Sequence, residues 1–204
     1  MRSSQLLVAG VAAATAMSLA AAGCGSKPAP APSKSASATS STSSVTSAPA
    51  SSALPTDYTG WLIQATDIDA PIPFTASPPA SNPNGQPGVA TTFSTQDGSH
   101  IIKDTIQVLA DPGAANDALN AAKAGQGAGL SHPTTTPTKV GTNGTVLSGN
   151  LPDNSKGVAI LLFTEGKAFV ALEFDGPADS LPPEDFVNDV GTKQDAAVKK
   201  GLGG

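Results

Sequence analysis

The sequence predicts an α+β domain in which an antiparallel sheet packs with two main helices, preceded by a signal peptide and a disordered linker. Three observations support this prediction. Short segments of alternating apolar and polar residues are separated by turn sequences, as in antiparallel strands. Two longer segments, 111–125 and 182–201, have the spacing and end residues of helices. Residues 25–57, by contrast, contain almost no large apolar side chain that could build a core.

Residues 1–23 have the order of a secretory signal peptide. Arg2 supplies positive charge, the stretch from Leu6 to Ala22 is uncharged and apolar, and Gly23 is the small residue before the expected cut. Cys24 follows directly and is the only cysteine of the chain. An ordinary secretory signal with an incidental cysteine is the alternative interpretation.

The run Ala22-Gly23-Cys24 resembles a lipobox, the recognition site of bacterial lipoproteins. Ala21 departs from the pattern, since Leu, Val or Ile is more usual there. The resemblance implies that the Cys24 thiol takes a diacylglycerol and that cleavage falls between Gly23 and Cys24. It also implies acylation of the new amine, with palmitate as the expected chain. Because two or more chains anchor a protein stably, we expect a lipoprotein on the extracytoplasmic face of the cell membrane.

Residues 24–57 form a second region, a linker made mostly of Ser, Ala, Thr and Pro. Such a segment buries too little apolar surface to offset its ordering entropy, so we expect it to be disordered. About thirty flexible residues reach roughly 30–35 Å. The linker would tether the domain to the membrane, and O-glycosylation of its hydroxyls stays an open alternative.

Residues 58–204 suit one domain of ordinary size. They hold all but one of the chain's 16 acidic residues, eight lysines and no arginine. This balance argues against nucleic acid as a partner, because phosphate recognition needs clustered Lys and Arg. With Cys24 outside the domain, no internal disulfide can form, and stability must come from packing.

The elements are expected in the following order. A short N-terminal helix at residues 61–68 precedes an irregular loop, Ala70 to Gly88, that contains six prolines. The predicted strands are Val89–Phe93, Ile101–Leu109, Thr145–Ser148, Val158–Phe163 and Phe169–Phe174. The fourth of these is apolar on both faces, as in a central strand, and a turn at 165–167 joins it to the fifth as a hairpin.

Both predicted helices have recognisable ends. Asp111-Pro112 is typical of a helix start, and Gly125 is the expected stop, followed by a loop that extends through Thr138. The final helix begins near Pro182-Pro183, with Asp179 or Ser180 before it, and ends at Gly201. Its interior Gly191 should cost about 1 kcal/mol relative to Ala.

Few residues of the domain carry catalytic chemistry. Its histidines are His100, at the start of a strand, and His132, in a loop. No Gly-x-Ser-x-Gly motif is present, and the glycine run at 125–129 follows a helix rather than a strand, which disfavours a phosphate loop. Two distant histidines do not supply the ligands of a zinc site. The sequence therefore predicts a protein that is not an enzyme, with no catalytic residue, metal or cofactor.

Carboxylates gather at two places. Asp175 and Asp179 bracket a Gly-Pro turn, and Glu184, Asp185 and Asp189 begin the last helix. Acid–base chemistry or calcium binding are alternatives, but no Asp-x-Asp-x-Asp-Gly loop is present, so turn and capping roles are favoured.

Asp104 is unusual because it falls on the apolar face of the second strand, between Ile102 and Ile106. An inward Asp104 would need a non-local partner, since a buried lone carboxylate is costly. A break in register that turns Asp104 outward is the simpler expectation.

Four stretches carry a resemblance to known proteins: residues 61–63, 88–93 and 104–110 and the final helix. They look like small mycobacterial and related actinobacterial lipoproteins. The domain of those proteins is similar to the Mog1/PsbP-like sandwich and to the extracellular sensor domain of a mycobacterial serine/threonine kinase. That sensor carries disulfides, which this domain lacks. The resemblance implies a non-enzymatic binding or adaptor role and transfers no site residues.

Two functions follow as hypotheses. The first is a lipid-anchored interaction module of the cell envelope that binds an envelope protein or glycan. The alternative is a carrier of an apolar ligand, such as an envelope lipid, held between the sheet and a helix. The small-faced helix after Asp111 and the low aromatic content motivate the alternative, which requires a cavity above about 300 Å³.

Overall fold

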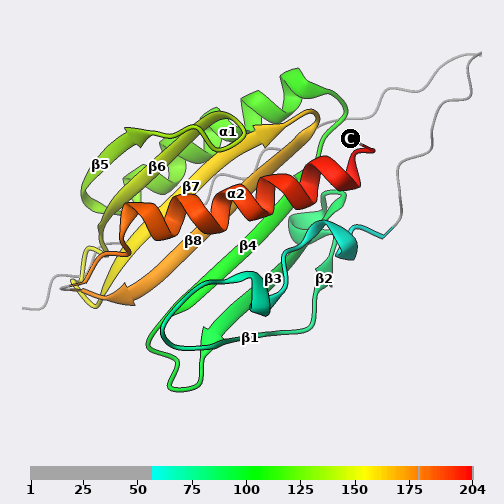
Figure 1. Ribbon diagram of the computed structural model, residues 1–204. Coiled ribbons are helices and arrows are strands. Elements are labelled where there is room, and N and C mark those ends of the chain that lie inside the picture. The colour runs from blue at the N-terminus through cyan, green and yellow to red at the C-terminus, as the bar shows by residue number, and fades with distance from the viewer. Residues whose placement is uncertain (1–56, 179, 204) are drawn as a thin grey trace, which may run out of the picture. The chain divides into compact units, whose positions relative to one another are not determined.

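The computed structural model describes residues 57–178 and 180–203. The predicted signal, the cleavage and lipidation site at Gly23 and Cys24, and the linker up to residue 56 therefore lie outside the described residues. Within the described part, eight strands form one antiparallel sheet that carries two α-helices (Figure 1). The α+β class predicted from the sequence is confirmed.

The sheet has the strand order β1-β3-β4-β8-β7-β6-β5, and β2 also pairs with β3. The strands are β1 (Phe74–Ala76), β2 (Ala80–Ser81), β3 (Gly88–Thr95), β4 (Ile101–Val108), β5 (Ser131–Pro137), β6 (Thr142–Asn150), β7 (Lys156–Glu165) and β8 (Ala168–Pro177). The helices are α1 (Pro112–Ala128) and α2 (Glu184–Gly201), with 3-10 turns η1 (Thr59–Trp61), η2 (Ala65–Asp67) and η3 (Pro83–Gly85).

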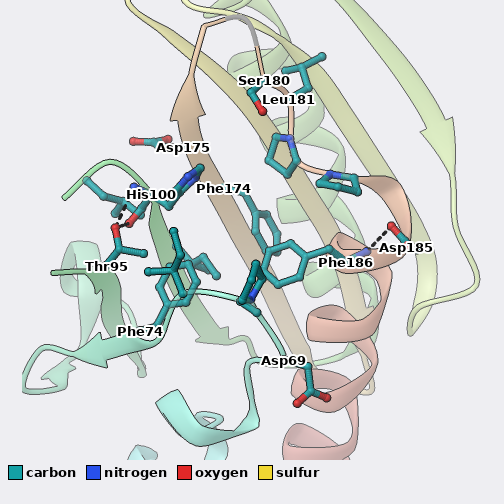
Figure 2. Close-up of a pocket in the computed structure, with 17 residues that line it drawn as sticks. Asp69, Phe74, Thr95, His100, Phe174, Asp175, Ser180, Leu181, Asp185 and Phe186 are labelled. Carbon is teal, nitrogen blue, oxygen red and sulfur yellow. Dashed lines mark hydrogen bonds between the residues drawn. The ribbon is translucent and has the colours of Figure 1, made fainter. Parts of the chain in front are cut away.

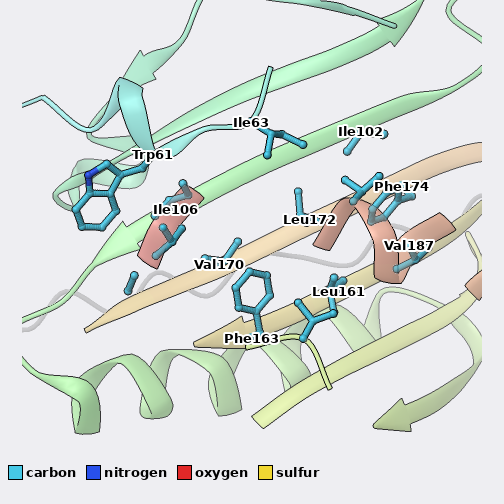
Figure 3. Packing of buried hydrophobic residues seen from close by; sticks show 14 of the residues in the cluster. Trp61, Ile63, Ile102, Ile106, Leu161, Phe163, Val170, Leu172, Phe174 and Val187 are labelled. Atoms are coloured by element: carbon cyan, nitrogen blue, oxygen red, sulfur yellow. The ribbon is translucent and has the colours of Figure 1, made fainter. Parts of the chain in front are cut away.

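The two helices lie on opposite faces of the sheet, α1 behind it and α2 in front of it in Figure 1. Alternate residues of each strand point to opposite faces, and the buried side chains accordingly form two clusters. The cluster under α2 includes Val89, Phe93, Ile102, Ile106, Leu161, Phe163, Val170, Leu172, Phe174, Val187, Val190 and Val198 (Figure 3). The cluster under α1 includes Ala115, Leu119, Leu130, Leu147, Val158, Ile160, Leu162 and Phe169.

The N-terminal segment before β1 packs on the same face of the sheet as α2. Tyr58 and Trp61 are buried, and their rings meet edge to face with centroids 5.1 Å apart. The fully buried amide of Gln194 in α2 donates to the carbonyl of Trp61 at 2.7 Å and accepts from the Ile63 N–H at 3.0 Å. This pair of hydrogen bonds fixes the segment beside α2. The predicted short helix is present as the separate turns η1 and η2.

The β7–β8 hairpin agrees with its prediction. β7 lies between β6 and β8, and its interior residues are buried on both faces. Glu165 pairs with Ala168, so Gly166 and Lys167 make a two-residue turn, with Gly166 at φ +52°. In β8, Phe174 faces α2 while Glu173 faces the other side and bonds to Lys103.

Helix α1 begins as predicted but is longer than predicted. The Asp111 carboxylate accepts a hydrogen bond from the Ala114 N–H at 2.9 Å, as an N-cap does. The helix continues past Gly125 to Ala128, so the loop predicted there is wrong. Glycine weakens a helix without ending it when its φ stays negative, and burial of Leu119 and Leu130 on the sheet holds this segment in place.

Two glycines of α2 allow the helix to pack closely, so the expected destabilisation by Gly191 relative to alanine is not their main effect. A Cβ on Gly191 would collide with Leu161 of β7, and a Cβ on Gly201 would collide with the Trp61 indole. Gly201 is the last helical residue, as predicted. The helix starts after Pro183, close to the predicted start near Pro182-Pro183, and its N-cap residue makes no side-chain hydrogen bond. Asp179 lies outside the described residues.

Three further strands replace predicted loops. The stretch after Leu130 forms β5, an edge strand that pairs with β6 although it contains Pro133 and Pro137. Proline is tolerated there because one side of an edge strand needs no N–H donor. In the proline-rich loop, β1 and β2 pair with β3 for three and two residues respectively. Pairing with a strong neighbouring strand therefore outweighs poor local propensity at both edges.

Candidate functional site

A pocket of about 390 Å³ opens on the α2 face of the sheet. Ile102 of β4 and Phe174 of β8 line it from the sheet, Phe74 of β1 from the N-terminal side, and Phe186 from the first turn of α2. Figure 2 shows these side chains around the pocket, with His100 near its upper end and Asp69 at its lower end. Segments that are far apart in the sequence therefore form one hollow.

The lining is mainly apolar and stiff. The rings of Phe174 and Phe186 meet edge to face with centroids 5.9 Å apart. Three prolines also line the pocket, namely Pro71, Pro182 and Pro183. Since proline fixes φ, the segments on both sides of the pocket have little freedom to collapse into it.

Ile72 and Leu181 distinguish this pocket from the rest of the surface. They are the two exposed large hydrophobic residues of the described part of the chain, with 45% and 46% of their surface accessible. Both line the pocket. Single exposed apolar side chains are ordinary, but their convergence on one apolar hollow is typical of a binding site.

His100 is held at the pocket by the turn between β3 and β4. Its backbone N–H donates to the Thr95 hydroxyl at 3.2 Å, and that hydroxyl donates to Asp97 at 2.7 Å. Hydrogen bonds from Thr95 and Ser99 lower the pKa of Asp97 to about 2. A Cβ on Gly176 would stand 3.4 Å from Nδ1 of His100, so the imidazole lies against the end of β8.

The carboxylates of the pocket differ in their partners. Asp69 accepts from Lys193 at 2.7 Å. Asp175 contributes the end of β8, while its buried carboxylate is paired with Lys156 at 3.0 Å and Lys103 at 3.3 Å. Asp185 accepts from the Phe186 N–H at 3.0 Å and, among the described residues, has no cationic partner.

A smaller cleft of about 180 Å³ lies on the other side of the α2 start. Thr134 and Thr136 of β5, Ser148 of β6 and Glu184 of α2 line it, together with Val146, Ala159 and Val187. Pro182 lines both this cleft and the apolar pocket. The N-terminal end of α2 is therefore flanked by one apolar hollow and one polar hollow.

Asp104 is buried, so the expectation that it turns outward is wrong. The register of β4 with β3 and β8 runs unbroken through the pairs Thr91–Asp104 and Asp104–Leu172. The side chain has no accessible surface, and neither carboxyl oxygen has a hydrogen-bond partner within the described residues. Burial raises the pKa of Asp104 to about 8, and the carboxyl is accordingly protonated at neutral pH.

The other sequence candidates do not form a common site. His132 lies on edge strand β5 with φ +48°, whereas His100 lies in the turn just before β4. Glu184 and Asp185 lie in the first turn of α2, and Asp189 pairs with Lys193 one turn later at 2.8 Å. Within residues 57–178 and 180–203, no three His, Cys, Asp or Glu side chains gather as metal ligands would.

The sequence did not indicate the apolar pocket, and the cavity expected between the sheet and the small-faced helix is not where the pocket lies. The available signal was the placement of Ile72 and Leu181, large apolar residues next to prolines in predicted loops. Each of these residues alone is ordinary on a protein surface, and only the fold brings the two together at one pocket.

Comparisons with known proteins give no family. No protein-family model matches the chain, and a search of curated proteins finds no match. In the ranges that the structure describes, no helix has the length and apolar character needed to span a membrane.

Proposed function

We propose that this protein is a binding protein of the cell envelope, held at the extracytoplasmic face of the membrane by lipid, that accommodates an apolar ligand in the pocket beside α2. The observation that carries the proposal is the convergence of Ile72 and Leu181 on one apolar hollow. This is the second of the two functions expected from the sequence, with the ligand placed on the α2 face.

The dimensions of the pocket support a small ligand or one chain of a larger one. A volume of about 390 Å³ falls within the range of about 300–1,000 Å³ that is usual for small-molecule sites. Phe74, Phe174 and Phe186 offer aromatic surface to an alkyl chain. Burying such a chain is favourable by about 0.8 kcal/mol per CH₂ group.

Binding fits the pocket better than catalysis does. His100 and Ser180 both line it, but within the described residues no hydrogen bond joins the serine hydroxyl to the imidazole. Asp175, the carboxylate of β8 that lines the pocket, is held by two lysines. A nucleophile, a base and an orienting carboxylate arranged in series are therefore not supported.

The membrane anchor rests on Cys24 and the signal before it. The change Cys24→Ser removes the thiol that would take the lipid. We expect the full chain to incorporate a radiolabelled fatty acid such as palmitate and the variant to incorporate none. Absence of label from the unchanged protein, or equal label in the variant, would contradict the lipid anchor.

The ligand site is tested with the neutral fluorescent probe N-phenyl-1-naphthylamine and the full chain carrying Cys24→Ser. We expect saturable binding, weakened at least tenfold by Ile72→Asp or Leu181→Asp, because each places a charge at the apolar rim. Ala121→Asp on the exposed side of α1 is the matched control. Lack of saturable binding, or equal weakening by the control, would contradict the proposal and leave docking of an envelope protein as the better hypothesis.

A further inference from the structure

The polar cleft beside α2 has the chemistry of a head-group site. Thr134, Thr136 and Ser148 present three hydroxyls to it, and Glu184 adds a carboxylate. Thr134 donates to the Ser148 carbonyl at 3.3 Å, while the hydroxyls of Thr136 and Ser148 form no hydrogen bond with the described residues. A hydroxyl both donates and accepts, and a carboxylate accepts. This set complements a molecule that itself carries several hydroxyls.

The cleft and the apolar pocket are neighbours on the same face of the sheet. Pro182 lines both, and the first turn of α2 contributes Glu184 to the cleft and Phe186 to the pocket. A single amphiphile can therefore place its chain in the pocket and its head in the cleft, with the link between them passing over Pro182.

The charges near the two hollows select among head groups. No lysine or arginine lines either one in the described part of the chain, whereas Glu184 and Asp185 stand at their shared border. These carboxylates repel a phosphate or carboxylate head. The partial positive charge at the start of α2, about half an elementary charge, offsets only part of these two negative charges. The preference for a neutral head over a trimethylammonium head therefore rests on the three hydroxyls of the cleft, with which a quaternary ammonium forms no hydrogen bond. A neutral head rich in hydroxyls fits best.

We propose that the cleft lined by Thr134, Thr136 and Ser148 binds the neutral, hydroxylated head group of an amphiphile whose alkyl chain occupies the adjoining apolar pocket. A glycolipid has this chemistry. The inference rests on the proposed function, because the cleft of about 180 Å³ holds only the head.

The experiment compares three twelve-carbon amphiphiles, each below its micellar concentration, by isothermal titration of the full chain carrying Cys24→Ser. The probes are dodecyl maltoside, dodecanoate and dodecyltrimethylammonium. We expect dodecyl maltoside to bind at least tenfold more tightly than the other two. The double change Thr136→Val with Ser148→Ala removes two hydroxyls, and it should abolish this preference without weakening the binding of dodecyltrimethylammonium.

Thr135→Val is the matched control, because Thr135 is exposed on the same strand and its register partner Leu147 belongs to the α1 face. This control should keep the maltoside preference. Binding of all three probes with equal affinity, tighter binding of either charged probe, or an unchanged preference in the double variant would overturn the head-group site while leaving the apolar pocket intact. Failure of all three probes to bind would instead overturn the proposed function.

Discussion

The two faces of the sheet are covered in different ways. On one face, α1 lies close to the strands through the small side chain of Ala115, with Leu119 filling the space toward β7 and β8. On the other face, the cover is shared between α2 and the N-terminal segment, which are joined through Gln194. One face is thus covered by a single continuous helix, whereas the other is covered by two segments that meet at a junction.

The junction is where the irregular features of the molecule gather. The apolar pocket lies where the N-terminal segment and the start of α2 diverge, with Phe74 on one side and Phe186 on the other. The buried and unpaired Asp104 lies on the same face. Both features lower the stability of the core, and their place on the α2 face is consistent with the ligand site proposed there.

The largest effect is expected at Asp104. Its pKa is about 8 in the folded state against 3.8 ordinarily, so the unfolded state loses its proton first as the pH rises. The ionisation of Asp104 therefore contributes no destabilisation below pH 4, a growing one up to pH 8, and a constant one above it. At about 1.4 kcal/mol per pH unit, Asp104→Asn should stabilise the protein by up to about 5 kcal/mol at pH 8.

Urea unfolding of both proteins between pH 4 and pH 9 measures this difference. The gain should shrink toward zero near pH 4, apart from a constant offset for the amide. Asp117→Asn on the exposed side of α1 controls for the loss of a carboxylate. A difference between the wild-type protein and Asp104→Asn that does not change with pH would contradict a neutral, buried Asp104.

The filled face should be sensitive to loss of volume. Leu119 is 1% exposed in the α1 core, and Leu119→Ala should lower the free energy of unfolding by about 2–5 kcal/mol. Phe74 is half-buried at the pocket wall, and Phe74→Ala should cost less although it removes more atoms. If Leu119→Ala and Phe74→Ala lower the free energy of unfolding equally, measured by thermal or urea unfolding, the two faces do not differ in how tightly they are packed.

Replacing a glycine by alanine in each helix should give the smallest changes in stability, with opposite signs in α1 and α2. Gly191→Ala inserts a methyl group against Leu161 and should destabilise the protein by about 1–3 kcal/mol. Gly125 in α1 has open space around its Cβ position, so Gly125→Ala should stabilise by up to about 1 kcal/mol. Differential scanning calorimetry measures both shifts, and stabilisation by Gly191→Ala would refute the close approach of α2 to β7.

Local patterns predicted those parts of the fold that depend on near neighbours. The β7–β8 hairpin follows from alternation and a two-residue turn, and the Asp111 cap follows from a carboxylate placed before proline. Strand β5 was missed because its threonines and prolines look like a loop until β6 supplies a partner. Whether such a segment forms a strand or a loop depends on pairing with a neighbouring strand, and the sequence of the segment alone does not show that pairing.

The candidate site could not be predicted from local sequence patterns either, because it too depends on contacts between distant segments. The pocket is lined by three separate stretches of the chain, at residues 69–74, 95–102 and 174–186, and no short window of sequence contains more than one of them. Burial of Asp104 similarly depends on a covering layer supplied by distant parts of the chain. The alternation of the strand correctly placed Asp104 on the apolar face. The expectation that it turns outward was wrong because it assumed that a carboxyl group avoids burial, whereas a protonated carboxyl is buried here.

The most direct test of a functional α2 face is a nuclear magnetic resonance titration of the full chain carrying Cys24→Ser with dodecyl maltoside. We predict saturable chemical-shift changes at the backbone amides of Ile72, Phe74, Ile102, Leu181 and Phe186, with the amides of α1 unchanged. Changes confined to α1, or shifts that grow without saturation on both faces of the sheet, would contradict this account.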